Sequence, residues 1–320
     1  MDNHPGPETL LEAIRYFKDT DTCLSYMVGL RWPDGVVCPT CGSRAVTFLS
    51  TRRVWKCREA HARQQFSIKV GTVFEDSPIG LDKWLPAMWM LVNDKNGISS
   101  YEVARALAVT QRTAWFMMHR IRLVVQTGSF LKMKGDVEVD ETFIGGKSRF
   151  MHKGRRAAKI KGTGGMGKAA VMGLLERHGP DGHSRVRVKQ VPNVRRATLA
   201  PEVRQNVETG SAIYSDALKS YEGLAPDYVH EVIDHAESYV RGKVHTNGLE
   251  NFWSLLKRGI KGTYVSVEPF HLFRYLDEQA YRFNTRKGTD RSRFVEALRS
   301  ILDKRLTYKA LTGVEALATT

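Results

Sequence analysis

Three acidic residues, far apart in the chain, stand where strands or an amphipathic helix could present them to divalent metal ions. Asp140 ends the alternating run Val-Glu-Val-Asp, Asp216 follows the strand-like run Ala-Ile-Tyr-Ser, and Glu250 lies in a helical pattern. Two magnesium or manganese ions held about 4 Å apart by carboxylates can activate an attacking oxygen and stabilise the leaving oxygen of a phosphodiester. Taken alone, each residue is more simply a solvated strand end or a helix cap. Together they favour cleavage chemistry on nucleic acid.

The helix expected from about 247 to 260 carries Glu250 on its polar face. Its apolar stripe consists of Leu249, Phe252, Trp253, Leu256 and Ile260. Lys257 lies two turns beyond Glu250 and projects the same way, so its ammonium group could hold substrate phosphates near the metal ions. We expect the neighbouring Arg258 to contact DNA.

Three of the four cysteines are clustered. Cys38 and Cys41 enclose a Pro-Thr pair on a tight turn, and Cys57 is followed by His61 in a Cys-x3-His pattern. Such pairs are typical of tetrahedral zinc sites that hold together a segment too small to bury its own core. The alternative is three buried thiols with a surface histidine. We expect a structural Cys3His zinc site, with His61 as the least certain ligand.

A helix-turn-helix is indicated where Ser99 and Ser100 begin one helix and Thr110 caps a second that runs to about Arg122. In this motif, the leading end of the second helix reaches base edges in the major groove of DNA. Helix pairs of this kind also occur in proteins that do not bind DNA, but the basic charge of this chain favours DNA. The expected contacts are Gln111, Arg112 and Thr113.

The stretch from 142 to 175 contains no acidic residue and eight lysines and arginines. It is either a solvated insertion or, because it follows Asp140 directly, a loop that contacts phosphates beside the active site; we favour the loop. The DNA contacts expected there are Lys153, Arg155, Arg156, Lys159 and Lys161. The run Gly162 to Ala169 resembles a P-loop, but Ala169 stands where a serine or threonine would bind magnesium, so we expect no nucleotide cofactor.

Composition bounds the class of protein. The 320 residues carry a net charge of +15, and 42% are hydrophobic, which is enough for packed cores and favours a polyanionic partner. We expect this partner to be double-stranded DNA, with no membrane role. The first residues lack a basic segment followed by an apolar one, so we expect no secretion signal and a cytoplasmic protein that associates with the nucleoid when bound.

Changes in pattern along the chain divide it into five parts. We expect an N-terminal helical segment over 1–30, a zinc ribbon over 31–75 and a helix-turn-helix region over 76–130. A mixed α/β domain over 131–288, in which strands are followed by helices, and a C-terminal helical tail over 289–320 complete the chain.

Six blocks of sequence, in this order, resemble bacterial insertion-sequence transposases of the ISXO-like DDE group. The blocks are CPTCGS, HARQQFSIKVGTVFEDS, NGISSYEVARAL with TAWFMMHRIR, VEVDETFIGG, IYSDALKSY and HTNGLENFWSLLKRGIKGTY. The resemblance covers about Cys38 to Lys287, and the last block is its most specific part.

The resemblance implies a ribonuclease-H-like catalytic domain with a mixed sheet and flanking helices, preceded by the zinc ribbon and the helix-turn-helix module. It assigns Asp140, Asp216 and a third residue to the metal site. The third is Glu250, with Asn247 as the alternative, because this position varies in the family. His245 and Lys257 belong to the same block and are expected to assist.

The implied function is that of a DNA transposase, which binds the terminal inverted repeats of an insertion sequence. It would cleave strands and transfer them into target DNA with two Mg2+ or Mn2+ ions. Since two element ends must be held together, we expect a homodimer or a larger assembly on DNA. The alternatives are a non-catalytic zinc-ribbon and helix-turn-helix regulator, and a nuclease of the same fold.

Overall fold

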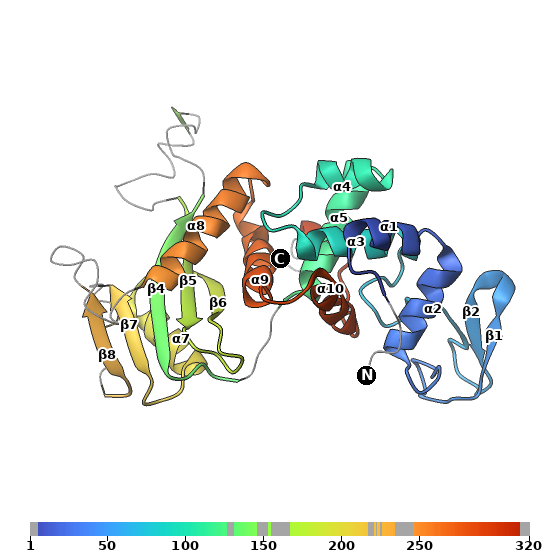
Figure 1. Cartoon of the computed structure of the whole chain (residues 1–320), viewed down its shortest axis with the longest axis horizontal. Coiled ribbons are helices and arrows are strands. Elements are labelled where there is room, and N and C mark those ends of the chain that lie inside the picture. The colour runs from blue at the N-terminus through green and yellow to red at the C-terminus, as the bar shows by residue number, and fades with distance from the viewer. Residues whose placement is uncertain are drawn as a thin grey trace. The chain divides into compact units, whose positions relative to one another are not determined.

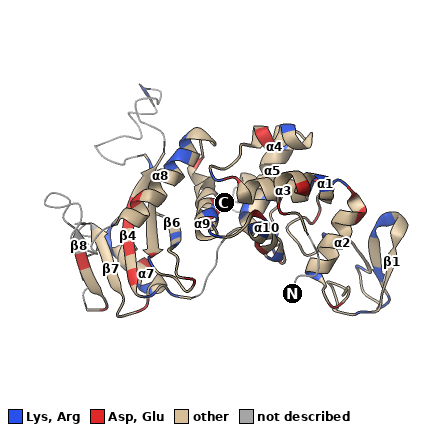
Figure 2. Cartoon of the chain, in the orientation of Figure 1, with Lys and Arg blue, Asp and Glu red and all other residues tan. Residues whose placement is uncertain are grey.

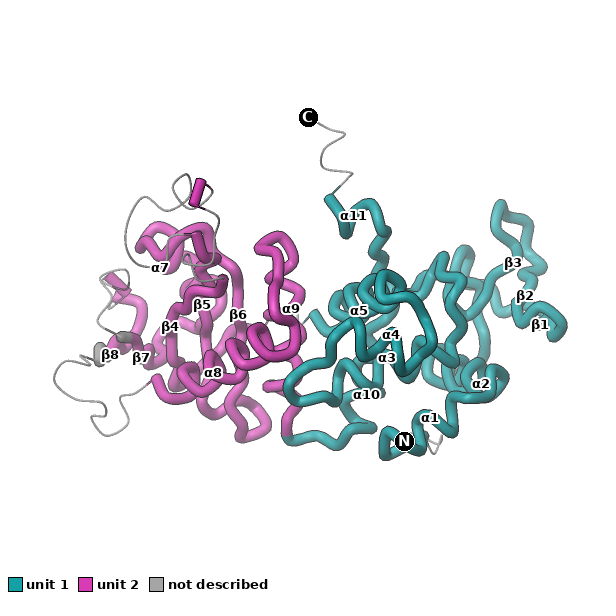
Figure 3. The backbone as a smooth tube through the Cα atoms, turned by 90° about the horizontal axis from the view of Figure 1, so that it is seen from above, with its two compact units in different colours: residues 1–126, 287–320 teal, residues 127–286 magenta. Residues whose placement is uncertain are grey.

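The computed structural model describes residues 6–126, 131–145, 153–154, 167–216, 221, 223–224, 226–233 and 246–313, with the backbone alone at 216, 232 and 233. The chain forms two compact units, coloured separately in Figure 3. The first comprises residues 1–126 together with 287–320, and the second comprises residues 127–286. No helix within the described ranges is long and apolar enough to cross a membrane.

A helical core organises the first unit. Its helices are α1 (Leu10–Tyr16), α2 (Thr20–Arg31), α3 (Leu81–Asn93), α10 (Asp290–Arg299) and the short α11 (Tyr308–Thr312). Phe294 of α10 lies against the rings of Phe17 and Trp89, with ring centroids 5.6 and 5.0 Å apart. Because aromatic side chains bury large apolar areas, this contact ties the C-terminal segment to the N-terminal helices.

The expected helix pair is present as α4 (Ser100–Leu107) and α5 (Gln111–Val124). Ser99 and Glu102 form a capping box at the start of α4, and the Thr110 side chain accepts a hydrogen bond from the backbone N–H of Thr113. Ala108 adopts a left-handed conformation with φ 49°, which ends α4 and turns the chain sharply into α5.

A three-stranded antiparallel sheet follows α2. It consists of β1 (Val46–Leu49), β2 (Val54–Cys57) and β3 (Gln65–Phe66), and the 3-10 turn η1 (Ser50–Arg52) links β1 to β2. Its small core is aromatic: the Trp55 ring contacts Trp32, Phe48 and Phe66 with centroid distances of 5.6, 4.9 and 6.0 Å. So few buried side chains stabilise a segment only weakly, which is where a structural metal ion contributes most.

The second unit contains a five-stranded mixed sheet. Its strands are β4 (Asp136–Ile144), β5 (Ala169–Glu176), β6 (Arg185–Val191), β7 (Ala212–Asp216) and β8 (Val229–Ile233), arranged in the order β6-β5-β4-β7-β8. Neighbours are antiparallel from β6 to β4, and parallel from β4 through β7 to β8. The carboxyl ends of β4, β7 and β8 therefore share one edge.

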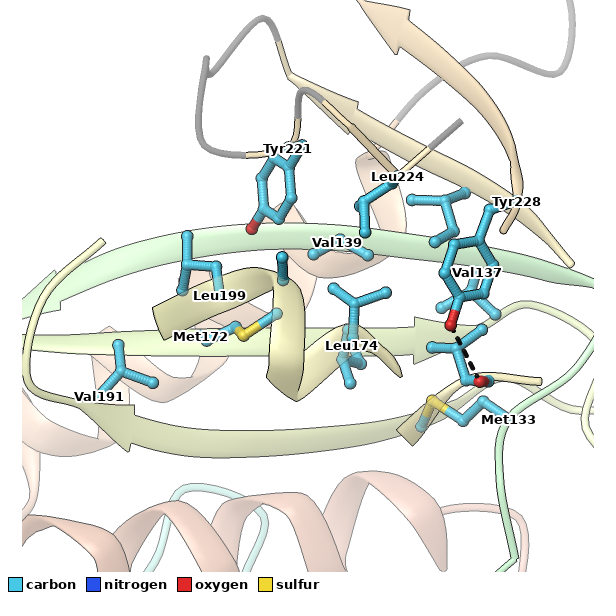
Figure 4. Packing of buried hydrophobic residues seen from close by; sticks show 14 of the residues in the cluster. Met133, Val137, Val139, Met172, Leu174, Val191, Leu199, Tyr221, Leu224 and Tyr228 are labelled. Atoms are coloured by element: carbon cyan, nitrogen blue, oxygen red, sulfur yellow. Dashed lines mark hydrogen bonds between the residues drawn. The ribbon is translucent and has the colours of Figure 1, made fainter. Parts of the chain in front are cut away.

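Helices cover both faces of this sheet. On one face, α7 (Arg196–Asn206) packs Leu199 and Val203 against the apolar cluster that includes Val139 and Ile213 (Figure 4). On the other face, α8 (Asn247–Gly262) packs against β4 and β5, and α9 (Leu272–Asn284) packs against β6 (Figure 1). Side chains alternate between faces along a strand, so β4 directs Val137 and Val139 towards α7. Glu138 and Asp140 point towards α8.

The expected fold class, a mixed α/β domain of ribonuclease-H-like organisation beside a zinc ribbon and a helical module, is confirmed. Two details differ. The sequence analysis did not identify α7, whose polar residues and internal Pro201 weaken the amphipathic pattern. Within the C-terminal helical tail expected over 289–320, the described residues form two separate helices, because α10 ends at Arg299 with Ser300 as its C-cap and α11 begins at Tyr308.

Candidate active site and zinc centre

The structure brings Asp140 and Asp216 to adjacent backbone positions on the neighbouring strands β4 and β7. In the parallel pairing of β4 with β7, Val139 lies opposite Ser215, so the next residue on each strand is one of the two aspartates. Asp216 itself pairs with Ile233 of β8. Two aspartates distant in sequence thus stand side by side where β7 ends and its parallel pairing with β4 stops, while β4 itself continues to Ile144.

The Asp140 carboxylate is held by hydrogen bonds to both of its oxygens. The indole Nε1–H of Trp253, on α8, donates to Oδ2 at 2.8 Å. The backbone N–H of Glu141 donates to Oδ1, also at 2.8 Å. Asp140 is half-buried, so its carboxylate is oriented by the protein and still reached by solvent. Charge-assisted bonds of this length fix the plane of the carboxylate.

A second carboxylate of β4, Glu138, fixes the start of α8. Its side chain is 1% exposed and accepts hydrogen bonds from Arg177 Nε and from the backbone N–H of Leu249, each at 2.9 Å. The N-cap residue Thr246 makes no side-chain capping bond in the described structure, so a glutamate from the sheet binds one of the unpaired N–H groups at this helix end. A negative charge is also favoured there by the helix dipole.

The first turn of α8 presents the expected third ligands. Asn247 and Glu250 are exposed, and the Thr246 hydroxyl donates to Glu250 Oε1 at 3.5 Å. Glu250 precedes Trp253 by three residues and therefore lies on the same side of the helix, one turn from the residue that contacts Asp140. His245 lies outside the described residues.

Basic residues extend the polar face of α8. Lys257 is half-buried, Arg258 and Lys261 are exposed, and Figure 2 shows Lys and Arg gathered in the C-terminal half of this helix. Of the expected phosphate-contacting loop, Lys153 is described and exposed. Arg155, Arg156, Lys159 and Lys161 lie outside the described residues.

The four expected zinc ligands converge. Ligand atoms of Cys38, Cys41, Cys57 and His61 all lie within 4.8 Å of one another. The Cys41 and Cys57 Sγ atoms are 3.7 Å apart, and Cys38 Sγ is 3.4 Å from His61 Nε2. Tetrahedral zinc, with Zn–S about 2.3 Å and Zn–N about 2.0–2.1 Å, requires separations of about 3.8 and 3.5 Å. The four donor atoms fit a structural zinc ion, with His61 as the fourth ligand beside the three cysteines.

Local electrostatics suit the Cys38 thiolate. Burial opposes its ionisation, but backbone N–H groups of Cys41 and Thr40 donate towards its sulfur, and the net effect lowers the pKa of Cys38 to about 7. A thiol that ionises near neutral pH is a ready metal ligand, because zinc binds the thiolate. The backbone of the Cys38-to-Cys41 turn therefore favours the thiolate form of Cys38.

The residues expected to read DNA lie at the leading end of α5 and are partly engaged within the first unit. Gln111 Nε2 donates to Ser100 Oγ at 2.8 Å. Arg112 Nε donates to the Tyr308 hydroxyl at 2.9 Å, and its guanidinium carbon lies 4.6 Å from the centroid of that ring. The Thr113 and Thr110 hydroxyl oxygens are 2.8 Å apart. Arg112 is exposed beyond this contact.

Sequence reasoning missed two roles that the structure makes plain. In the alternating pattern of its strand, Glu138 is a polar residue expected to face solvent. Only its position between two valines could have indicated a buried carboxylate that pairs with Arg177 and with a helix N–H. Trp253 was assigned to the apolar stripe, where it does pack, but its indole N–H also bonds to Asp140. A buried tryptophan needs an acceptor, and that requirement was the available signal.

Comparisons with known proteins identify the family of this chain. Residues 132–284 match the family model of the ISXO2-like transposase domain, and residues 18–63 match that of the transposase zinc-ribbon domain. A protein of the Halobacterium salinarum transposable element ISH50, itself uncharacterized, is 26% identical over 305 residues, covering 92% of this chain and 99% of the relative. An uncharacterized transposase-like protein of Haemophilus influenzae is 35% identical over 95 residues, covering 29% of this chain and 76% of the relative. The chain belongs to the ISXO2-like transposase family of insertion elements.

Proposed function

We propose that this transposase binds the terminal inverted repeats of its insertion element, cleaves DNA strands there and joins the freed ends to target DNA. The observation that carries this proposal is the placement of Asp140, in the middle of β4, beside Asp216 at the carboxyl end of β7, inside the matched transposase domain. Paired aspartates on rigid strands are the arrangement that holds hard divalent cations against a phosphodiester.

Asp140, Asp216 and Glu250 would hold two Mg2+ or Mn2+ ions, with Asn247 as the alternative third ligand. Support comes from α8, which two contacts tie to β4: Leu249 N–H to Glu138, and Trp253 N–H to Asp140. These contacts hold the start of α8 against β4, which supports a site shared by the two elements. Bound ions would supply activation of the attacking oxygen and neutralisation of charge at the scissile phosphate.

The chain's own residues would position the substrate. In the first step, water attacks the scissile phosphate, and the bond to the 3′ oxygen breaks to release a 3′-hydroxyl end. In the second, this hydroxyl attacks a target phosphate and displaces another 3′ oxygen, so each step exchanges one phosphodiester oxygen for another. Lys257 and Arg258 would grip the neighbouring phosphates, and His245 would assist at the same site.

DNA recognition would use the helix-turn-helix and the basic loop. Gln111, Arg112 and Thr113 would face base edges, while the basic residues between 142 and 175 would contact phosphates nonspecifically. The net charge of +15 supports a large electrostatic contribution. Each phosphate contact should add about 0.9 to the slope of log affinity against log salt. We propose a homodimer or larger assembly, since both element ends must be held.

The test is strand transfer with a labelled element end, target DNA and magnesium. The wild-type protein should produce joined products, while Asp216→Ala should bind the end normally and join nothing. Asp181→Asn, which changes an exposed carboxylate of the same unit, is the matched control and should behave like wild type. Binding without cleavage by the wild type would indicate a regulator, and cleavage without joining would indicate a nuclease; either result contradicts the proposal.

A further inference from the structure

The contact between Trp253 and Asp140 depends on a glycine in the neighbouring strand. The antiparallel pairing of β4 with β5 places Gly173 directly opposite Asp140. A Cβ atom at Gly173 would lie 2.6 Å from Cζ2 and 2.7 Å from Cη2 of Trp253, closer than side chains pack. The missing side chain at Gly173 therefore leaves the space in which the indole lies over β5 with its N–H at Asp140, in the middle of β4.

Packing alone does not explain this arrangement. Trp253 is 4% exposed and belongs to the apolar cluster of α8, so its ring contributes to the core. Its N–H, however, bonds to the half-buried Asp140 carboxylate on β4, 2.8 Å away, and the resulting charge-assisted bond joins two elements that carry proposed metal ligands. A phenylalanine of similar shape would preserve most of the packing and remove this bond.

We propose that Trp253 is a positioning residue for the metal-binding carboxylate of Asp140, with Gly173 providing the space for its indole. This inference rests on the proposed function, in which Asp140 binds the metal ions. The indole N–H holds Oδ2 and the Glu141 N–H holds Oδ1, so rotation of the carboxylate about its χ2 bond would break both bonds. The lone pairs directed to the metal ions are thereby aimed before the ions bind.

If the indole N–H orients the Asp140 carboxylate, removing the N–H should weaken metal binding. Without the indole N–H, the carboxylate samples other orientations, and metal binding must then select the productive one. Partners of metal ligands typically change metal affinity or activity by about 10- to 100-fold when removed. We expect Trp253→Phe to weaken metal binding by about 10-fold or more and to raise the magnesium concentration needed for half-maximal cleavage by a similar factor.

The experiment uses the full chain with zinc bound. Free and bound Mn2+ are measured by electron paramagnetic resonance during titration of wild type, Trp253→Phe and Trp84→Phe. Trp84 is the matched control: it is 1% exposed, and its Nε1–H donates to Ser77 Oγ at 3.1 Å in the other unit. We expect weaker Mn2+ binding in Trp253→Phe alone. Wild-type Mn2+ affinity in a folded Trp253→Phe would overturn the proposal.

A spectroscopic measurement tests the hydrogen bond itself. The chain has six tryptophans, and the indole 15N–1H resonance that disappears in Trp253→Phe identifies Trp253. We expect Asp140→Asn to shift this resonance because the acceptor changes from a carboxylate to a neutral amide. An unmoved resonance would overturn the proposal. If Trp253→Phe misfolds, the resonance is assigned instead from the shift that Gly173→Ala causes, because the added Cβ would lie against the Trp253 ring. The comparison of wild type with Asp140→Asn then still tests the bond.

The two proposals fail differently. If Asp140→Asn retains cleavage and Mn2+ binding, the proposed metal site is wrong. If Asp140→Asn loses both while Trp253→Phe keeps wild-type affinity and metal dependence, the metal site stands and the positioning role of Trp253 is rejected.

Discussion

Truncating Glu138 should release the start of α8 from the sheet. The carboxylate is 1% exposed and accepts one hydrogen bond from Arg177 and one from the Leu249 backbone, each at 2.9 Å. Hydrogen bonds to charged groups contribute about 1.5–3 kcal/mol each, and removing one partner of a buried ion pair costs about 3–5 kcal/mol. Glu138→Ala should therefore destabilise this region by about 3 kcal/mol, because it removes the buried acceptor of the half-buried Arg177 guanidinium and of a helix N–H.

Hydrogen exchange read by mass spectrometry is the direct assay. Since about 1.4 kcal/mol corresponds to a factor of ten, peptides covering the first turns of α8 should exchange at least about 100-fold faster in Glu138→Ala. Glu202→Ala is the control, because Glu202 pairs with the largely exposed Lys189, and such surface pairs contribute about 1 kcal/mol or less. Equal exchange in the two variants would refute the assignment of Glu138 as the group that fixes α8.

Three further outcomes are expected. Chelation of zinc should release one ion per chain and expose the amides of the ribbon strands to exchange, and amides that stay protected would contradict a structural role for the metal. Gly173→Ala should lower the free energy of unfolding by about 1–3 kcal/mol in denaturant titrations, since its Cβ would lie 2.6 Å from Trp253; an unchanged midpoint would show that the site has room. Burial lowers the pKa of His230 below 6.5, so the unfolded chain binds its proton first as pH falls. The contribution of neutral His230 to the free energy of unfolding should be fully present above about pH 6.5 and should decrease as the pH falls below that value. His230→Gln should flatten this decrease.

Local sequence patterns predicted the parts of this molecule whose chemistry is local. The spacing of Cys38, Cys41, Cys57 and His61 predicted a zinc site because tight turns and a short hairpin bring those positions together. Capping residues such as Thr110 located α5 because the cap and the helix it begins are adjacent in sequence. Each of these signals lies within a few residues of the structure that it determines.

The rest depends on pairing between distant segments, which local patterns do not encode. Nothing near Asp140 indicates that β4 would pair with β7, and only the family resemblance placed Asp216 in the same site. The role of Gly173 follows from its register opposite Asp140 and from the helix that crosses it. Likewise, a local pattern assigns Phe294 to a separate C-terminal tail, whereas in the structure its ring packs against Phe17 in the core of the N-terminal helices.

The most direct test of the proposed metal site is to map the polypeptide around the bound ions. Fe2+ placed in the magnesium sites, with ascorbate and peroxide, generates radicals that cut the nearby backbone, and mass spectrometry locates the cuts. Cuts should cluster in the middle of β4 around Asp140, at the end of β7 around Asp216, and in the first turn of α8 between Asn247 and Glu250. Excess Mg2+ should suppress them. Cuts that avoid any one of these three segments, or that persist unchanged in Asp140→Asn, would contradict the account.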